Sequence, residues 1–383
     1  MKTDERYIFR VYGNQNVLEA TKKRLAWILT EFKNVVVTTS GGKDSIVNYH
    51  LLMEVAKKMN RLPVNVLFID QEIEWRASID IVRGQMTNPD VNPLWMQIPF
   101  RLFNSTSVDE HWLNCWEPKD KARWMRPQET YSFKENIYGA DRFNKLFPAI
   151  IGNMFKGEKV AIIGGVRCEE SPARTIGLTS AAMYKWVTWG TKVGAKTGVY
   201  SFYPLYDWHT SDVWKAIHDH GWPYNKIYDF QFQRGFPIKD MRISNFHHET
   251  SVKNVFTCQE FEPDTYAKAC ARLAGLDAAA KFGHADYFPK ELPPMFGDWS
   301  EYRDYLLEKL VVRPDWKIKF QKFFERQDRI FKPHLGEKIP LLHVKSILTN
   351  DWECIKLRNF ETQAGIREIM TNYAKEHPKV KLT

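Results

Sequence analysis

The chain has 383 residues, of which 44% are hydrophobic and 26% are charged. These fractions match soluble globular proteins, which excludes an intrinsically disordered chain and allows two to three domains of roughly 150 residues each. The formal net charge is +9, and residues 301–383 carry 17 basic and 12 acidic side chains, so more than half of the excess lies in the last fifth of the chain. That excess indicates either a solvated helical surface or an attraction to a polyanion such as nucleotide phosphates, nucleic acid or an acidic protein.

The first 165 residues alternate between helical and strand patterns. A helix is predicted over 16–32, where Leu18, Leu25, Leu29 and Phe32 share one stripe. The β-branched run 35–39 predicts a buried strand, followed by a glycine-containing turn and a helix from about 44 to 59. Further strands are predicted at 64–69, 94–98 and 160–163, the last preceded by a helix capped by Asp141. The pattern predicts an α/β fold with a parallel sheet and a ligand at the carboxyl ends of its strands.

The turn after the first strand carries the strongest functional signal. Its glycines let the backbone approach a ligand closely, and the start of the next helix offers unpaired N–H groups to an anion. The serines add hydroxyl donors, and Lys43 adds a compact positive charge for a phosphate. Asp44 would repel a bare phosphate, so it indicates a divalent cation or a contact with the helix N-terminus. The run reads Ser40-Gly41-Gly42-Lys43-Asp44-Ser45.

Two further strand ends carry polar side chains. Asp70 ends the second strand and Glu72 follows, so either carboxylate could accept from ribose hydroxyls or bind Mg²⁺. After the 160–163 strand, Arg167 and Arg174 follow a glycine pair, and their guanidinium groups can hold a phosphate or sulfate bidentately, with Glu170 orienting one of them. The alternatives are a solvated acidic loop for Glu72 and a surface ion-pair cluster for the arginines.

The remaining segments suggest how the chain is organised. Residues 100–140 show no clean period and are predicted to form an insertion or lid. After about residue 240 the strand signal fades and 264–280, 301–310 and 318–331 have helical patterns. We therefore expect a nucleotide-binding α/β domain over 1–240 and a basic, mostly helical domain over 241–383.

Cysteine usage and the absence of long apolar runs bear on the compartment. The five cysteines, Cys115, Cys168, Cys258, Cys270 and Cys354, form no CxxC pair, which argues against a disulfide scaffold, a structural zinc site and a compact iron–sulfur motif, so no Fe–S cluster is expected. No apolar stretch approaches the ~18 to 20 residues that cross a bilayer, and the N-terminus lacks a secretory signal. We expect a cytoplasmic protein that makes no membrane contact.

Three segments in the right order resemble one family. The 40–45 run is similar to the PP-loop of ATP pyrophosphatases and phosphoadenosine phosphosulfate (PAPS) reductases. Residues 164–174 resemble the G-x-R-x-x-[EQ]-S-x-x-R segment of PAPS-reductase-like proteins, and 203–214 resemble their P-L-x-D-W-[ST]-x-x-D-V-W stretch. Within the family, the likeness is to a prophage-type subgroup that carries an extra C-terminal domain of unknown function and includes co-regulators acting with a ParB-like partner.

The resemblance implies roles for individual residues. It implies an adenine nucleotide site in which ATP is the substrate and Mg²⁺ the metal, with cleavage between the α- and β-phosphates. The residues it implies for catalysis are Lys43, Asp44, Arg167 and Arg174. Those for nucleotide binding are Ser40, Gly41, Gly42, Lys43, Ser45, Asp70, Gly165, Arg167, Glu170 and Ser171. Those for the metal are Asp44, Asp70 and Glu72.

Two departures from the family pattern keep other functions open. PAPS reductases commonly have Asp-Thr-Gly where this chain has Asp70-Gln71-Glu72, and they use a Glu-Cys-Gly-Leu/Ile-His tail where this chain has Glu353-Cys354 followed by Ile-Lys-Leu. Cys354 is predicted to be buried and inert. An ATP pyrophosphatase or adenylylating enzyme is therefore the first expectation. PAPS or APS reduction, or another sulfur transfer, is the second, and a nucleotide-binding co-regulator with a protein or DNA partner is the third.

Overall fold

The computed structural model describes residues 13–378 apart from 108–109, 194–197, 244, 248–251, 279–290, 350 and 352. The chain divides into two compact units. The first comprises the chain up to Phe100, Trp116–Pro118 and Arg126–Ile243, and the second comprises Arg101–Cys115, Lys119–Met125 and the chain from Ser244 on.

The first unit is built on a six-stranded sheet with the order β3-β2-β1-β6-β8-β7. Five neighbouring strands run parallel, and β7 pairs antiparallel with β8 at one edge. The predicted α/β fold with a parallel sheet is therefore confirmed. The strands are β1 (Asn34–Thr38), β2 (Val64–Ile69), β3 (Val91–Met96), β6 (Val160–Ile163), β7 (Gly190–Val193) and β8 (Val199–Phe202).

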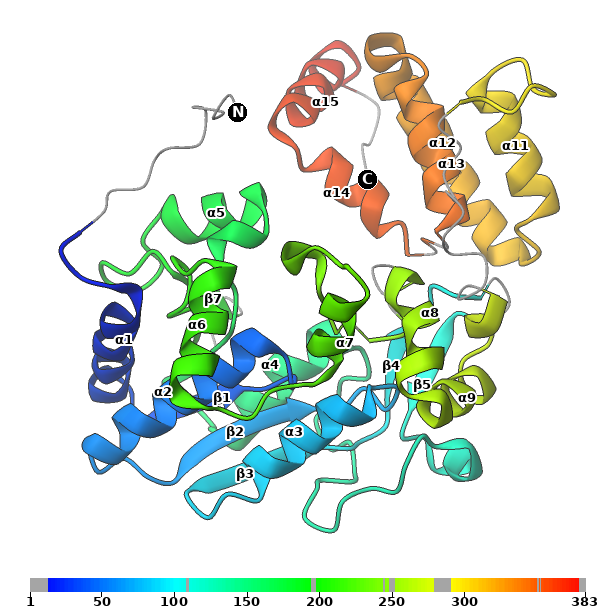
Figure 1. Cartoon of the computed structure of the whole chain (residues 1–383). Coiled ribbons are helices and arrows are strands. Elements are labelled where there is room, and N and C mark those ends of the chain that lie inside the picture. The colour runs from blue at the N-terminus through cyan, green and yellow to red at the C-terminus, as the bar shows by residue number, and fades with distance from the viewer. Residues whose placement is uncertain are drawn as a thin grey trace. The chain divides into compact units, whose positions relative to one another are not determined.

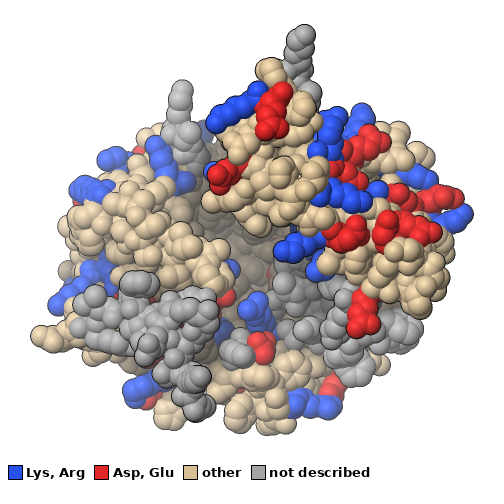
Figure 2. Space-filling model, turned by 90° about the horizontal axis from the view of Figure 1, so that it is seen from above, with Lys and Arg blue, Asp and Glu red and all other residues tan. Residues whose placement is uncertain are grey.

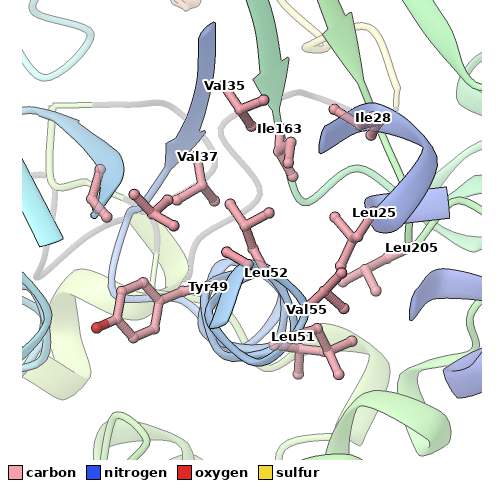
Figure 3. Packing of buried hydrophobic residues seen from close by; sticks show 14 of the residues in the cluster. Leu25, Ile28, Val35, Val37, Tyr49, Leu51, Leu52, Val55, Ile163 and Leu205 are labelled. Atoms are coloured by element: carbon pink, nitrogen blue, oxygen red, sulfur yellow. The ribbon is translucent and has the colours of Figure 1, made fainter. Parts of the chain in front are cut away.

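The central strands form because both faces of the sheet are covered. In β6 all four residues are buried, as is expected when a parallel sheet carries helices on each side. Alternate side chains point to opposite faces, so Val35, Val37 and Ile163 pack together on one of them. Figure 3 shows these side chains beside Leu52 and Val55 of the helix that follows β1.

Helices connect the strands of this sheet. In Figure 1, α3 lies in front of the sheet and α4 behind it, as right-handed crossovers in opposite directions along the sheet require. The helices of the first unit are α1 (Val17–Glu31), α2 (Lys43–Lys58), α3 (Arg76–Met86), α4 (Phe143–Met154), α5 (Pro172–Thr179), α6 (Thr210–His220) and α7 (Ile227–Gln233).

Two predicted boundaries are wrong. Strand β3 begins at Val91 rather than Leu94 and includes Pro93, which the sheet tolerates because β3 is an edge strand. Helix α4 begins after Arg142, without a side-chain cap, and not at Asp141. Strands β7 and β8 were not expected, since four residues each are too few to show a period.

The segment predicted to be an insertion contains structure of its own. Strands β4 (Phe100–Phe103) and β5 (Trp112–Cys115) form a two-stranded sheet, and a short 3₁₀ helix spans Pro118–Arg123. The residues around 126–133 belong to the first unit, where Phe133 bridges to Met96 at the end of β3.

In the residues beyond 250 that the structure describes, the second unit is mostly helical, as the sequence pattern predicts. A core that includes Trp316, Phe320, Phe324, Val344 and Leu357 holds its later helices together. None of the helices that the structure describes is both long and apolar enough to cross a membrane. The helices described there are α8 (Val252–Phe261), α9 (Pro263–Arg272), α11 (Trp299–Lys309), α12 (Pro314–Leu335), α13 (Lys338–Leu348), α14 (Ile355–Glu361) and α15 (Ala364–Glu376).

Candidate functional site

The loop between β1 and α2 is a tight turn that only glycine allows at its centre. Gly41 has a φ of +68°, in the left-handed region that side chains other than glycine rarely adopt. A Cβ atom at Gly41 would lie 2.7 Å from the backbone oxygen of Ser78, the third residue of α3. The loop therefore packs directly against the start of α3, and this close approach is possible because Gly41 has no side chain.

This turn leaves backbone amides unpaired at the N-terminus of α2. Gly42 occupies the cap position, and because glycine has no side chain it cannot accept a capping hydrogen bond from these amides. Within the described chain, the N–H groups of Gly42, Asp44 and Ser45 have no hydrogen-bond partner. Unpaired amides at a helix N-terminus form an anion site, because the helix dipole adds positive potential there.

A second glycine keeps this site open from the β6 side. A Cβ at Gly165 would lie 3.2 Å from the amide nitrogen of Ser45 and 3.1 Å from the Cβ of Asp44. A side chain at 165 would therefore crowd the first turn of α2. The Ser45 hydroxyl donates to the Gly42 carbonyl oxygen over 2.8 Å and accepts from the Ser40 N–H over 3.2 Å, which stiffens the loop.

Lys43 supplies a positive charge beside these amides. Its side chain is largely buried, its Nζ lies 3.4 Å from an Asp44 carboxylate oxygen and 5.4 Å from the centre of the Tyr228 ring. Its backbone N–H donates to the Tyr228 hydroxyl over 3.3 Å. The ammonium group is thus held close to the helix start by a carboxylate and an aromatic face.

Arg167 joins the 164–174 segment to the loop. Its Nε donates to Asp44 over 2.5 Å, and its Nη1 donates to Glu169 over 2.7 Å. The Arg167 side chain is only 3% exposed, so its guanidinium is enclosed and paired with two carboxylates. In this arrangement Arg167 orients Asp44 and the start of α2 rather than facing outward.

Glu169 connects this ion pair to the start of α6. Burial alone would raise the pKa of the Glu169 carboxyl, but hydrogen bonds from His209, Thr210 and Arg167 outweigh it and lower the pKa to about 2. The Thr210 N–H donates over 2.7 Å and its hydroxyl over 2.9 Å. The 203–214 segment therefore contacts the site through Glu169, and the residue that caps α6 is His209.

Arg174 lies in the first turn of α5 and is the more open of the two arginines, with a side chain 48% exposed. It pairs with Glu170, while its N–H donates to the hydroxyl of the cap residue Ser171. Burial and then the positive charge of nearby Arg242 lower the pKa of the Arg174 guanidinium. Arg174 and Arg242 therefore lie close enough for their charges to interact.

Asp70 belongs to a separate buried network. Its carboxylate accepts from Arg126, which reaches both oxygens over 2.5 and 2.6 Å, and from the Trp95 indole and the Gln97 amide over 2.8 and 3.0 Å. Glu72 is fully buried and accepts from the Trp116 N–H over 2.8 Å. These contacts tie residues 116 and 126 to the end of β2.

The three carboxylates expected to hold Mg²⁺ do not fit a protein-held metal site. No group of three or more His, Cys, Asp or Glu side chains suited to a metal ion occurs in the described ranges. The two oxygens of Asp70 face an arginine and two neutral donors, and Asp44 faces Arg167 and Lys43.

The structure connects the glycine loop directly to several of the residues expected beside it, whereas Asp70 and Glu72 accept hydrogen bonds from Arg126 and Trp116. The 40–45 loop and Gly165 are in contact, and Arg167 and Glu170 join them through Asp44 and the Arg167 backbone. Sequence reasoning missed Tyr228, Glu169 and Arg242. Glu169 lies within the quoted motif and could have been found there, whereas Tyr228 is 185 residues from Lys43 and carries no local signal.

Comparison with known proteins finds a family match over the part of the chain that contains the glycine loop and the 164–174 segment. The model of the phosphoadenosine phosphosulfate reductase domain matches residues 34–235. The uncharacterized protein YbdN of Escherichia coli K12 is 29% identical over 317 residues, which are 79% of this chain and 77% of that protein. The uncharacterized protein MJ0973 of Methanocaldococcus jannaschii is 24% identical over 229 residues, which are 58% of this chain and 46% of that protein.

Among solved structures, PAPS reductase from Candida auris is 18% identical with a TM-score of 0.34, covering 62% of this chain and 98% of that one. FMN adenylyltransferase from Candida glabrata is 14% identical with a TM-score of 0.38, covering 60% of each chain. The family model spans more than half of the residues and includes β1, the glycine loop, the arginine segment and the start of α6. The chain therefore belongs to the phosphoadenosine phosphosulfate reductase domain family.

Proposed function

We propose that this protein binds ATP, or a related adenine nucleotide, with its phosphates at the N-terminus of α2. The observation that carries the proposal is the set of unpaired amides of Gly42, Asp44 and Ser45 next to the enclosed Lys43 ammonium. Amides and a lysine in this arrangement favour a phosphate oxygen, because the helix dipole and the ammonium both attract negative charge. Arg174 and the neighbouring Arg242 supply further positive charge on the open side.

The reaction we propose is cleavage between the α- and β-phosphates. A water molecule or an acceptor oxygen attacks the α-phosphorus, the bond to the bridging oxygen breaks, and pyrophosphate leaves with the electron pair. Negative charge grows on the leaving pyrophosphate, so donors already fixed in place stabilise the transition state more than the ground state. Lys43 and the α2 amides are such donors, and Arg167 acts by holding Asp44 and the first turn of α2 in position.

Thiol-dependent reduction of PAPS or APS is the alternative within the family, and the cysteines support it poorly. Cys354 is fully buried, and that burial raises the pKa of its thiol to about 12. Cys168 is also buried, and its backbone N–H donates to Tyr206. A nucleophilic thiolate needs an accessible sulfur with a lowered pKa, so nucleotide cleavage without a thiol is the better supported chemistry.

The test is to incubate the full chain with the Mg²⁺ complex of ATP as the substrate and to separate the nucleotide products by chromatography. The proposal expects AMP or an adenylate, together with pyrophosphate. Lys43→Met should reduce this turnover at least tenfold, since it removes one charge-assisted contact worth about 1.5 to 3 kcal/mol. Lys57→Met, at the exposed far end of the same helix, is the matched control and should leave turnover unchanged. ADP and phosphate as products would contradict the proposal.

A second candidate is a nucleotide-dependent co-regulator that acts with a ParB-like protein or DNA through the C-terminal region. It is favoured by an open pocket of about 690 Å³ at α14 and α15, lined by Arg358, Arg367 and Lys375. The one acidic residue in that lining, Glu361, is paired with Arg326. Elsewhere Figure 2 shows Lys and Arg interspersed with Asp and Glu on the face in view, so bulk charge alone gives little support.

This candidate predicts binding of nucleic acid that weakens steeply with salt, because phosphate contacts release counterions. Changing Arg358, Arg367 and Lys375 to Gln together should lower the affinity for a DNA duplex and reduce its salt dependence. ATP turnover should be unchanged in the same variant. DNA binding that is equally tight in the triple variant would contradict a role for this pocket.

A further inference from the structure

Tyr228 lies in α7, outside the three sequence motifs, yet its hydroxyl reaches the glycine loop. The hydroxyl accepts from the Lys43 backbone N–H over 3.3 Å. It also lies 3.7 Å from the place that a Cβ on Gly42 would occupy. The side chain is almost fully buried, at 3% exposure. A phenol oxygen therefore lies close to the backbone amides that we propose bind phosphate.

The proton of this phenol has no acceptor within the part of the chain that the structure describes. The Lys43 amide uses a lone pair of the oxygen, and no described group accepts from the O–H. Burial, followed by the negative charge of Asp44, raises the pKa of the Tyr228 hydroxyl, so the proton stays on the oxygen at neutral pH. A buried donor without an acceptor costs free energy, and a bound anion would remove that cost.

The ring is held in place by contacts on several sides. Trp214 of α6 meets it edge to face, with ring centres 5.1 Å apart, and the Lys43 ammonium lies over its face. Just before α7, the Asn225 amide donates to the Ser78 hydroxyl over 2.9 Å and its side-chain oxygen accepts from the Ile227 N–H. Ser78 is the residue on which Gly41 rests. The loop and Tyr228 are thus fixed against the same turn of α3.

We propose that Tyr228 is a phosphate-binding residue of the nucleotide site, which donates its hydroxyl proton to a phosphate oxygen held by the α2 amides while still accepting from Lys43. This inference rests on the proposed function and adds a side-chain donor that the motifs do not contain. It assigns α7 to the site and explains why a tyrosine hydroxyl is buried beside an anion cradle.

The experiment compares Tyr228→Phe with wild type by calorimetric titration with two probes, ATP and inorganic pyrophosphate. Phenylalanine keeps the ring, its contact with Trp214 and its contact with Lys43, and removes only the oxygen. Tyr224→Phe is the matched control, because the Tyr224 hydroxyl donates to Asp229 over 2.8 Å, away from the loop. Thermal melts without ligand report whether each variant folds.

Loss of one hydrogen bond to a charged acceptor should weaken binding of both probes by about 10- to 100-fold in Tyr228→Phe, with no change in Tyr224→Phe. Unchanged or tighter binding by Tyr228→Phe would overturn the inference, and so would equal weakening in both variants. If ATP and pyrophosphate bind wild type but Tyr228→Phe is unaffected, only this inference fails. If neither probe binds wild type, the proposed function fails first.

Discussion

Arg167 is expected to matter more for the stability of the first unit than for direct contact with the nucleotide. Its guanidinium is 3% exposed and donates to both Asp44 and Glu169. Arg167→Ala would leave Asp44, a carboxylate with only 16% of its side chain exposed, without its main cation. Removing one partner of a buried ion pair costs about 3 to 5 kcal/mol, because the remaining charge stays desolvated.

For a unit of this size, that loss lowers the melting temperature by about 6 to 20 °C, at roughly 2 to 4 °C per kcal/mol. Arg174→Ala is the matched comparison, since Arg174 is half exposed and pairs with Glu170, four residues earlier in the chain. Such a surface pair contributes about 0 to 1 kcal/mol, so this variant should melt within about 4 °C of wild type. Its ATP affinity should fall about 10- to 150-fold if the guanidinium contacts phosphate.

Differential scanning fluorimetry followed by ATP titration of the folded variants separates the two roles. Arg167→Lys should recover only part of the stability, because an ammonium cannot donate to two carboxylates with the geometry of the guanidinium fork. An Arg167→Ala protein with the melting temperature of wild type would refute the reasoning, since the enclosed ion pair would then contribute nothing to stability. A strongly destabilised Arg174→Ala would refute the contrast between the two arginines.

Three further outcomes are expected. Asp70→Asn should destabilise the protein strongly, because it removes the charge that Arg126 pairs with. The part of the variant that remains folded should bind ATP with the affinity of wild type. A loss of ATP binding that occurs only in the presence of Mg²⁺ would restore Asp70 as a metal ligand. Changing Cys168 and Cys354 together to Ser should leave nucleotide turnover intact, and loss of turnover with intact ATP binding would favour thiol chemistry. Burial and then the charge of Arg303 lower the pKa of His343 to about 2. The unfolded chain therefore takes up a proton below its ordinary pKa of about 6.5 while the folded chain does not, and stability should fall by about 1.4 kcal/mol per pH unit below that value. Urea titrations at pH 7 and pH 5 check this, and His343→Gln should show the shallower dependence.

The sequence predicted the part of the fold whose signals are local. A β-branched run at 35–39 and the apolar run at 64–69 became β1 and β2, because strands covered on both faces need continuous apolar residues. The glycine loop also has a local signal, because the tight turn places Gly41 at a positive φ that few other residues adopt.

The contacts that were not predicted join residues far apart in the chain. Asp70 meets Arg126 across 56 positions, and nothing near Asp70 distinguishes a carboxylate that binds a metal from one that binds an arginine. Arg167 stands where a phosphate-binding arginine was expected, but the sequence does not show that Asp44, 123 residues earlier, accepts from it. Side-chain direction across such separations is set by the packed fold and not by spacing along the chain.

Calorimetric measurement of ATP affinity tests most directly whether phosphate binds at the N-terminus of α2. The variants to compare are Gly41→Ala, whose new Cβ would meet the Ser78 oxygen at 2.7 Å, and Gly84→Ala, whose new Cβ would meet nothing within 4 Å. Both glycines lie in the first unit, so the pair controls for the general effect of adding a methyl group. We predict that wild type and Gly84→Ala bind ATP alike and that Gly41→Ala binds it at least tenfold more weakly. Equal ATP affinity in all three proteins, each folded by its melting curve, would contradict the site.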